Sequence, residues 1–213
     1  MTEILRTALP KGRLGSEIAD ILKKAGFLND SFKDSKDTRK LVFEDSESGM
    51  RYFWVKPFDV PVYVERGTAD IGFIGKDILL ERNPDVYELL ALNIGKCKIC
   101  SAALNGFVDD GMKPLRVATE FPNIARDYYS GIGREIDIIP IRGSAEIAPV
   151  LGLSDVIVDI VQTGTTLREN NLSVISVIAE VSARLIANKS AYKFKHNEID
   201  ELIRRLKEVD TNS

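Results

Sequence analysis

The alternation of short apolar runs with amphipathic stretches constrains this chain most. Residues 3–9, 69–75 and 155–161 are typical of strands, because each is a brief apolar run that ends at a turn. Apolar side chains recur at helical spacing after the first of these runs and again in residues 197–209. This order of strands and helices predicts an α/β protein with largely parallel sheets.

Length and charge narrow the class further. The 213 residues fit two α/β lobes with a cleft between them. With 29 Lys and Arg against 32 Asp and Glu, the net charge is −3, which gives no electrostatic footprint for nucleic acid. No apolar run approaches the roughly 20 residues of a membrane span, and Glu3 and Arg6 stand where a signal peptide is apolar. We therefore expect a cytoplasmic, soluble protein.

Cysteine and histidine are too scarce for most metal or disulfide chemistry. The chain has two cysteines and one histidine, which excludes a disulfide framework and most transition-metal sites. Cys97 and Cys100 form a lone C-x-x-C inside a strand-like run, so core packing is the expected role. A Ser–His–Asp hydrolase could be built only through His196, which we expect at the surface.

The strongest functional pattern is DVIVDIVQTGTTLREN, residues 155–170. A buried strand leads directly into Gln162–Thr166, and Thr166 with Glu169 matches a capping box that would start a helix. Backbone N–H groups and hydroxyls at such a turn suit a phosphate, and Asp159 could accept hydrogen bonds from sugar hydroxyls beside it. The alternative is a plain strand–turn–helix connection with threonine caps.

Three further strand-to-helix loops carry polar residues. Lys11 and Arg13 flank Gly12 after the first strand, at the start of a predicted helix. Cations there oppose the helix dipole, and binding an anionic ligand would be a reason for their presence. The alternative is a solvated basic turn. Gly75 and Lys76 form a second such loop, which is not a Walker A sequence. Ser144 and Glu146 follow Gly143 in a third. Alone, the last two loops are weak signals.

These motifs together resemble the ATP phosphoribosyltransferase family of histidine biosynthesis. The resemblance is carried, in order, by ALPKGRL, VKPFDVPVYVERGTADIGFIGKDIL, RVATEFPNIARDYY and GSAEIAPVLGLSDVIVDIVQTGTTLRENNL (residues 8–14, 55–79, 116–129 and 143–172). It implies transfer of the phosphoribosyl group of phosphoribosyl pyrophosphate to N1 of the adenine of ATP. It also implies two lobes like those of type II periplasmic binding proteins, with the active site between them.

The resemblance assigns candidate site residues. Asp159 would contact the ribose, and the loop Gln162, Thr163, Gly164, Thr165 and Thr166 would hold the phosphoribosyl group. Lys11, Arg13, Arg39 and Lys56 match basic positions of the first lobe that face pyrophosphate or nucleotide phosphates. Other candidate contacts are Asp155, Glu146, Ser144, Gly75 and Lys76. Mg²⁺ is the implied cofactor, carried by the substrate phosphates, with no protein ligand assigned.

The resemblance also suggests how the chain is divided and regulated. We expect lobe I in residues 1–93 plus 176–213, and the phosphoribosyl-binding lobe II in residues 94–175. The length matches the short form of the family. Catalytic subunits of the short form are expected to dimerise and to be completed by a regulatory subunit similar to histidyl-tRNA synthetase, in a hetero-octamer. We expect neither nucleic acid nor a membrane as a partner.

Two other functions compete with this interpretation. A nucleobase phosphoribosyltransferase shares an acidic residue before a TG-type loop, but it would usually have two adjacent acids, whereas Asp155 and Asp159 are separated. A solute-binding module could use the same bilobal fold, but it would be expected with a signal peptide or a fused regulatory domain.

Overall fold

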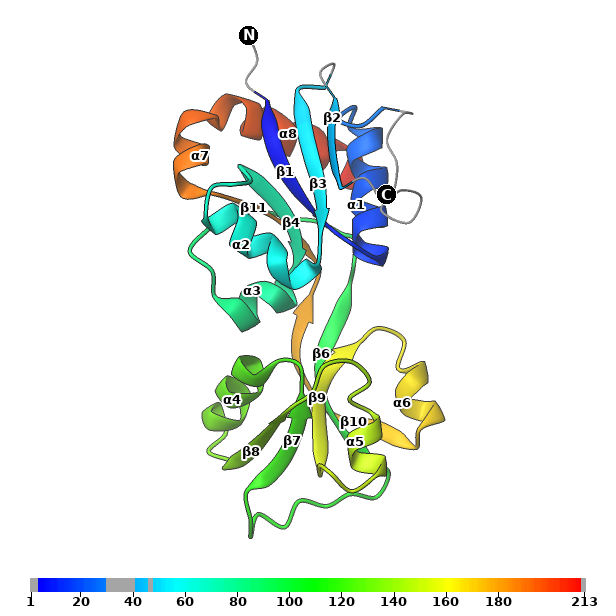
Figure 1. Cartoon of the computed structure of the whole chain (residues 1–213). Helices are drawn as coiled ribbons and strands as arrows, with labels where there is room; N and C mark the ends of the chain where they lie inside the picture. The colour runs from blue at the N-terminus through cyan, green and yellow to red at the C-terminus, as the bar shows by residue number, and fades with distance from the viewer. Residues whose placement is uncertain (1–3, 30–40, 46–47, 212–213) are drawn as a thin grey trace. The chain divides into compact units, whose positions relative to one another are not determined.

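The computed structural model describes residues 4–29, 41–45 and 48–211, so the candidate Arg39 lies outside the described residues. The chain divides into two compact units (Figure 1). Unit 1 comprises residues 1–79, 83–95 and 182–213, and unit 2 comprises residues 80–82 and 96–181. The sequence predicted a second lobe over residues 94–175. In the structure, the main segment of unit 2 starts at Lys96 and continues to Val181, because strand β10 (Leu172–Val181) belongs to the sheet of unit 2 over its whole length.

Unit 1 is built around a six-stranded sheet of order β2-β3-β1-β4-β11-β5. Its strands are β1 (Leu5–Pro10), β2 (Val42–Asp45), β3 (Met50–Val55), β4 (Ile71–Gly75), β5 (Tyr87–Ala91) and β11 (Ala183–Ala187). Its helices are α1 (Arg13–Lys24), α2 (Val60–Glu65), most of α3 (Lys76–Arg82), α7 (Lys189–Phe194) and α8 (His196–Asp210), with a 3₁₀ turn at Pro57–Asp59.

The alternation of side chains along β1 explains why helices cover both faces of this sheet. Leu5 and Leu9 belong to the core that α1 and α8 complete, whereas Ala8 points to the opposite face, where Val60 and Val64 of α2 pack. Figure 1 shows α1 and α8 on one side of the sheet and α2 and α3 on the other. The amphipathic stripe expected in residues 197–209 is confirmed, since Ile199, Leu202 and Leu206 of α8 are buried.

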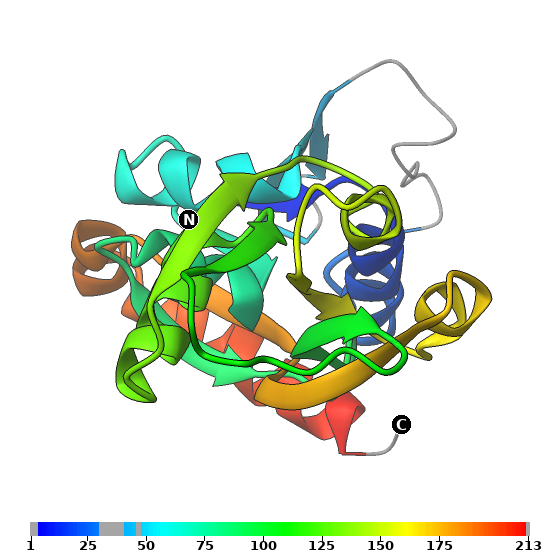
Figure 2. The ribbon, with the colours of Figure 1, turned by 90° about the horizontal axis from the view of Figure 1, so that it is seen from below.

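Unit 2 is built around a five-stranded sheet of order β10-β6-β9-β7-β8. Its strands are β6 (Cys97–Leu104), β7 (Leu115–Thr119), β8 (Ile136–Pro140), β9 (Val156–Val161) and β10 (Leu172–Val181). Its helices are α4 (Pro122–Gly131), α5 (Ile147–Val150) and α6 (Thr165–Glu169). Successive β6 residues face opposite layers. Ser101 hydrogen-bonds Tyr129 of α4, whereas Ala102 packs with Ala148 of α5 and Leu167 of α6. The ribbon in Figure 2 shows α4 on one side of this sheet and α5 and α6 on the other.

The expectation of largely parallel sheets is wrong. In the described residues β1 pairs in parallel with β3 and β4, and β7 with β8 and β9, but β2–β3, β4–β11, β5–β11, β6–β9 and β6–β10 are antiparallel. Parallel neighbours need a crossover connection, which helices supply around β1 and β7. The chain crosses between the units next to β6 and β11, and the strands there pair antiparallel.

Two elements were not anticipated from the sequence. Strand β5 (Tyr87–Ala91) is an edge strand with mostly exposed or half-buried side chains, so its apolar signal is weak. Helix α7 (Lys189–Phe194) is short and mostly exposed, but it has a readable start. The side chain of Asn188 accepts hydrogen bonds from the N–H groups of Ser190 and Ala191, as a favourable N-cap does.

Candidate active site

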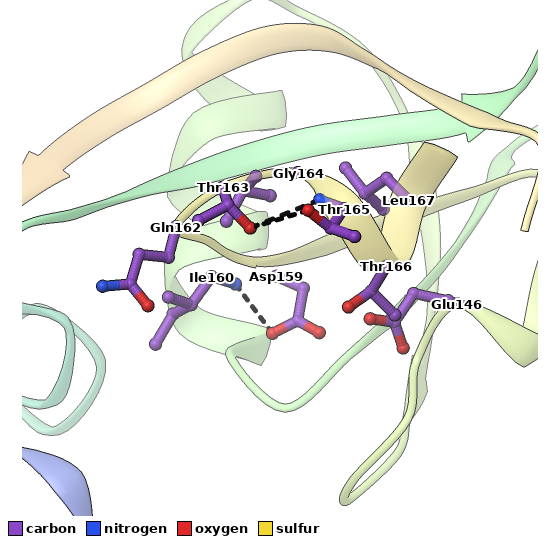
Figure 3. Close-up of a pocket in the computed structure, with 10 residues that line it drawn as sticks. Glu146, Asp159, Ile160, Gln162, Thr163, Gly164, Thr165, Thr166 and Leu167 are labelled. Atoms are coloured by element: carbon purple, nitrogen blue, oxygen red, sulfur yellow. Dashed lines mark hydrogen bonds between the residues drawn. The ribbon is translucent and has the colours of Figure 1, made fainter. Parts of the chain in front are cut away.

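The Gly/Thr loop of unit 2 borders a cavity of about 210 Å³. Strand β9 ends at Val161 and α6 begins at Thr165, and between them Gly164 adopts a left-handed conformation with φ 69°. Glycine is the residue best suited to that conformation. The residues lining the cavity are Glu146, Asp159, Ile160, Val161, Gln162, Thr163, Gly164, Thr165, Thr166 and Leu167 (Figure 3). The structure thus brings together Asp159 and the whole predicted loop.

The predicted capping box does not form. Helix α6 starts at Thr165, with Gly164 at the N-cap position and no side-chain cap, whereas the Thr166–Glu169 pattern places the N-cap two residues later, at Thr166. The hydroxyl of Thr166 therefore does not accept a hydrogen bond from the free N–H groups in the first turn of α6. With only five residues, α6 also has a small dipole, so phosphate binding at this loop depends on individual N–H and O–H donors.

Hydroxyl groups of the loop are linked to one another. Thr163 Oγ1 lies 3.1 Å from Thr165 Oγ1, and the Thr165 N–H donates to the same Thr163 oxygen at 3.4 Å. Figure 3 shows both contacts as dashed lines, with the side chain of Gln162 extending away from them. The loop thus carries a connected set of exposed hydroxyls beside a sharp backbone turn, an arrangement suited to an oxyanion.

Asp159 is the most perturbed acid of the site. Its side chain is half-buried at the end of β9, and the N–H of Ile160 donates to its Oδ1 at 2.7 Å. Burial raises the pKa of Asp159 from 3.8 to about 6; the Ile160 hydrogen bond opposes this, and the negative charges of Glu146 and Glu120 add to it. A raised pKa in a cavity is typical of functional carboxylates.

The other unit 2 candidates separate into two groups. Glu146 lines the cavity, and in Figure 3 its carboxylate lies near Thr166. Ser144 is exposed and does not line it. Asp155 lies at the amino end of β9 and receives two hydrogen bonds from the Arg116 guanidinium, at 2.6 and 3.1 Å. That pair holds the pKa of Asp155 below its ordinary value. In the structure Asp155 therefore links the start of β9 to Arg116 of β7.

The unit 1 candidates gather at the carboxyl edge of its parallel strands. Pro10 of β1 pairs with Val55 of β3, so Lys11 and Lys56 follow at neighbouring positions, and the Lys11 N–H donates to the Val55 carbonyl at 2.7 Å. Because Ala8 of β1 pairs with Gly72 of β4, Gly75 at the end of β4 lies level with Lys11. The carboxyl edge of parallel strands is where α/β sheets bind ligands.

These cations differ in their partners. Lys11 and Lys56 are exposed. Arg13 is exposed and lies 3.5 Å from Glu17, one turn along α1. The ammonium of Lys76 lies 2.5 Å from Glu88, which also accepts from Arg184 at 2.8 Å. The two cations hold the pKa of Glu88 below its ordinary value against the effect of burial. Lys76 is therefore already partly neutralised, whereas the first two lysines present their charge to solvent.

Neither a metal-binding cluster nor a bilayer-spanning helix is found in the described residues. In the described residues, no group of three or more His, Cys, Asp or Glu side chains is arranged to hold a metal ion. Cys97 and Cys100 are thiols and form no disulfide, and Cys100 is buried and Cys97 half-buried, consistent with packing in β6. Within the described ranges, no helix has the length and hydropathy needed to cross a bilayer.

Two residues of this site were missed from the sequence. Arg168 contacts the loop at Thr163 and Thr165. Its spacing of three residues from Thr165 on a short helix is a signal that could have found it. Glu120 affects the charge state of Asp159, although β7 and β9 are distant in sequence. Only the parallel pairing of these strands reveals that relation.

An acidic residue near a strand end, followed by a hydroxyl-rich turn around a left-handed glycine, suits an α/β protein that binds a phosphorylated sugar, because the acid accepts from sugar hydroxyls and the turn donates to phosphate. The sequence model of the ATP phosphoribosyltransferase family, HisG, matches residues 56–208. The chain therefore belongs to the ATP phosphoribosyltransferase family. Enzymes of this family join phosphoribosyl pyrophosphate and ATP to give phosphoribosyl-ATP, the first step of histidine biosynthesis.

Individual relatives agree over nearly the whole chain. The chain is 53% identical over 207 residues to an ATP phosphoribosyltransferase of Brachyspira hyodysenteriae, covering 97% of this chain and 100% of the relative. It is 47% identical over 211 residues to that of Clostridioides difficile, covering 98% and 99%. A solved chain of the ATP phosphoribosyl transferase (HisG:HisZ) complex from Thermotoga maritima is 35% identical with a TM-score of 0.84, covering 99% and 100%. These matches favour neither competing function considered from the sequence.

Proposed function

We propose that this chain is the short-form catalytic subunit, and that the cavity of unit 2 binds the phosphoribosyl group during the family's reaction. The observation that carries the site assignment is the convergence of Asp159 and the loop Gln162–Thr166 on one cavity. Ionised Asp159 accepts hydrogen bonds from the ribose hydroxyls, and the loop's N–H and O–H groups donate to the 5′-phosphate. Glu146 is a second candidate acceptor in the same cavity.

The chemistry is a displacement at the anomeric carbon. Adenine N1 forms a bond to that carbon while the bond to pyrophosphate breaks, and the carbon inverts. Charge on the ring oxygen and carbon becomes positive in the transition state, and negative charge grows on the leaving group. The protein's tasks are therefore to hold the ribose in place and to place cations at the pyrophosphate. Excluding water from the donor would limit its hydrolysis.

Lys11 and Lys56, with Arg13 and Lys76, are the proposed cations for the pyrophosphate or nucleotide phosphates. Their positions at the carboxyl edge of β1, β3 and β4 support this role. Arg39 stays a candidate from the family resemblance. The division of the chain into two α/β units supports the finer proposal that they correspond to the lobes of a type II periplasmic binding protein.

Mg²⁺ is the proposed metal, brought in on the substrate phosphates. Glu146 and Asp159 offer the carboxylate oxygens that Mg²⁺ prefers, but two carboxylates in one cavity do not make a protein cage for it. When bound, the ion would neutralise charge on the pyrophosphate group. The cytoplasm, where ATP is abundant, is the proposed location.

Removing either exposed lysine of the unit 1 edge should slow turnover. Because each is proposed to stabilise charge that grows on pyrophosphate, Lys11→Ala or Lys56→Ala should lower kcat by about tenfold or more, with a smaller change in the KM for ATP. Steady-state kinetics with both substrates varied would measure this. Lys24→Ala, an exposed lysine at the other end of α1, is the matched control. Equal kcat in all three variants and wild type would mean that Lys11 and Lys56 are only solvated.

A regulatory subunit resembling histidyl-tRNA synthetase is the proposed partner, in a hetero-octamer built on catalytic dimers. The likeness to a chain from a HisG:HisZ complex supports it. Histidine should then inhibit the assembled enzyme and leave the purified chain unaffected, because an effector needs a site whose affinity differs between two states. Initial rates with and without histidine, before and after adding the partner, would measure this. Strong inhibition of the chain alone, away from the ATP site, would place the regulatory site here instead.

The proposed reaction itself has a direct assay. The purified chain, mixed with ATP, phosphoribosyl pyrophosphate and Mg²⁺, should give an adduct with new ultraviolet absorbance and release pyrophosphate. The reaction should depend on both substrates. No adduct, even with the cognate regulatory subunit present, would overturn the proposed function.

A further inference from the structure

Arg168 of α6 crosses the phosphoribosyl loop outside the cavity. One guanidinium nitrogen donates to the Thr163 carbonyl at 3.0 Å, and another donates to Thr165 Oγ1 at 3.1 Å. A Cβ atom placed on Gly164 would lie 3.3 Å from the first of these nitrogens. Arg168 is not among the cavity-lining residues. It therefore holds the two ends of the turn together without being positioned to touch a bound sugar phosphate.

The guanidinium also biases the direction of the hydrogen bonds in the loop. Arginine can only donate, so it occupies one lone pair of Thr165 Oγ1 and favours the arrangement in which Thr165 donates its own proton elsewhere. Thr163 Oγ1 lies 3.1 Å away and also accepts from the Thr165 N–H. In that arrangement both lone pairs of Thr163 Oγ1 are in use, and its hydroxyl proton can be donated to a ligand in the cavity that Thr163 lines.

This direction matters because of the charges around the cavity. Among the described residues that line it, Glu146 and Asp159 are the charged ones and both are acidic. A phosphate is an acceptor with negative charge, so it can bind there only if the loop presents donors to it. A threonine free to rotate could equally present an oxygen lone pair.

We propose that Arg168 is a positioning residue for phosphoribosyl transfer, which orients the Thr165 and Thr163 hydroxyls so that the loop donates to the 5′-phosphate of phosphoribosyl pyrophosphate. The inference rests on the proposed function of this cavity and adds to it a residue that acts through others. Its simplest alternative is an exposed arginine that only caps its own short helix, whose removal would leave the donor kinetics unchanged.

Substitution at Arg168 separates these two roles. R168M removes the donor and should raise the KM for phosphoribosyl pyrophosphate about tenfold, with kcat and the KM for ATP within about twofold of wild type. R168Q, which can accept as well as donate, should behave like R168M and replaces it if R168M does not fold. R168K still only donates and should stay within about threefold of wild type. An unchanged KM in R168M or R168Q, or a loss in R168K as large as in R168M, would overturn the proposal.

Arg126 provides the matched control. Its guanidinium donates to Asn123 Oδ1, three residues earlier on α4, so it is also an exposed helical arginine with a local acceptor, but away from the cavity. R126M should leave the KM for phosphoribosyl pyrophosphate unchanged. An increase equal to that of R168M would show that the effect comes from loss of any exposed arginine.

A double-mutant cycle tests whether Arg168 acts through Thr163. T163V removes the hydroxyl through which Arg168 is proposed to act. Adding R168M to T163V should therefore raise the KM for phosphoribosyl pyrophosphate less than twofold further, whereas two independent changes would multiply. Effects of the two changes that multiply in full would contradict the hydrogen-bond chain.

Ribose 5-phosphate binding, measured by calorimetry without ATP, separates failure of this inference from failure of the proposed function. If wild type binds it and R168M binds about tenfold more weakly, both stand. Equal binding by the two proteins overturns the inference alone. If wild type does not bind ribose 5-phosphate but makes the adduct, the cavity assignment fails, and the role of Arg168 fails with it.

Discussion

Gly164→Val is expected to reduce kcat/KM for phosphoribosyl pyrophosphate by about a hundredfold or more, since misplacing a binding group by about 1 Å can cost that much. Glycine at this position has φ 69°, which costs an L-residue about 1–2 kcal/mol, and a β-branched side chain more. A Cβ added at Gly164 would lie 3.3 Å from the Arg168 guanidinium, so the damage would come from backbone strain and displacement of that guanidinium.

Gly133→Val separates local strain from loss of the site. Gly133 has nearly the same φ, 70°, and a Cβ there would meet no atom within 4 Å. Both variants should therefore lose comparable stability in denaturant unfolding, but only Gly164→Val should lose use of phosphoribosyl pyrophosphate. Parallel losses of activity in the two variants would show that the effect is general destabilisation.

The position of the Gly/Thr loop could be predicted because its signals are local. A buried apolar strand, a glycine and a run of hydroxyl residues lie within residues 155–170, and the cavity forms there. The start of α6 could not be predicted as well. The capping-box pattern places the N-cap at Thr166, whereas the structure has it at Gly164, which is in a left-handed conformation two residues earlier.

The pattern of apolar residues could not predict which strands pair when they are far apart in the sequence. Strand β11 reads like any apolar strand, but it returns antiparallel between β4 and β5, which changes the sheet from largely parallel to mixed. Charge pairing was equally hidden. Lys76 and Asp155 both fit a ligand-binding pattern in sequence, yet their partners Glu88 and Arg116 are placed beside them only by the tertiary structure.

Asp159→Asn should lower kcat/KM for phosphoribosyl pyrophosphate roughly ten- to a hundredfold, because a charged acceptor for the ribose hydroxyls is lost, worth about 1.5–3 kcal/mol. The pH profile should change as well. With a pKa of about 6, wild-type Asp159 becomes protonated as pH falls through 6, and its donor kcat/KM should fall there. In the variant this inflection should be missing. A wild-type profile that is flat between pH 5 and 7 would contradict the role of Asp159 as an ionised acceptor.

The same substitution should stabilise the fold at neutral pH. A carboxyl whose pKa is raised from 3.8 to about 6 on folding binds its proton more tightly in the native state, so native stability falls as pH rises through that window and stays reduced above it. Asparagine has no charge to desolvate. After allowance for partial solvent exposure, the variant should gain on the order of 1–2 kcal/mol in unfolding free energy at pH 7. Denaturant unfolding at pH 7 and at pH 4 measures this, and the gain should shrink to roughly a fifth at pH 4, where the wild-type carboxyl is protonated in the native state and only partly so in the unfolded chain. A variant less stable than wild type at pH 7 would mean that the charge of Asp159 helps to hold the fold. A gain at pH 7 together with loss of donor use would mean that the free protein carries a destabilising buried charge at the position where the ribose hydroxyls are to be bound.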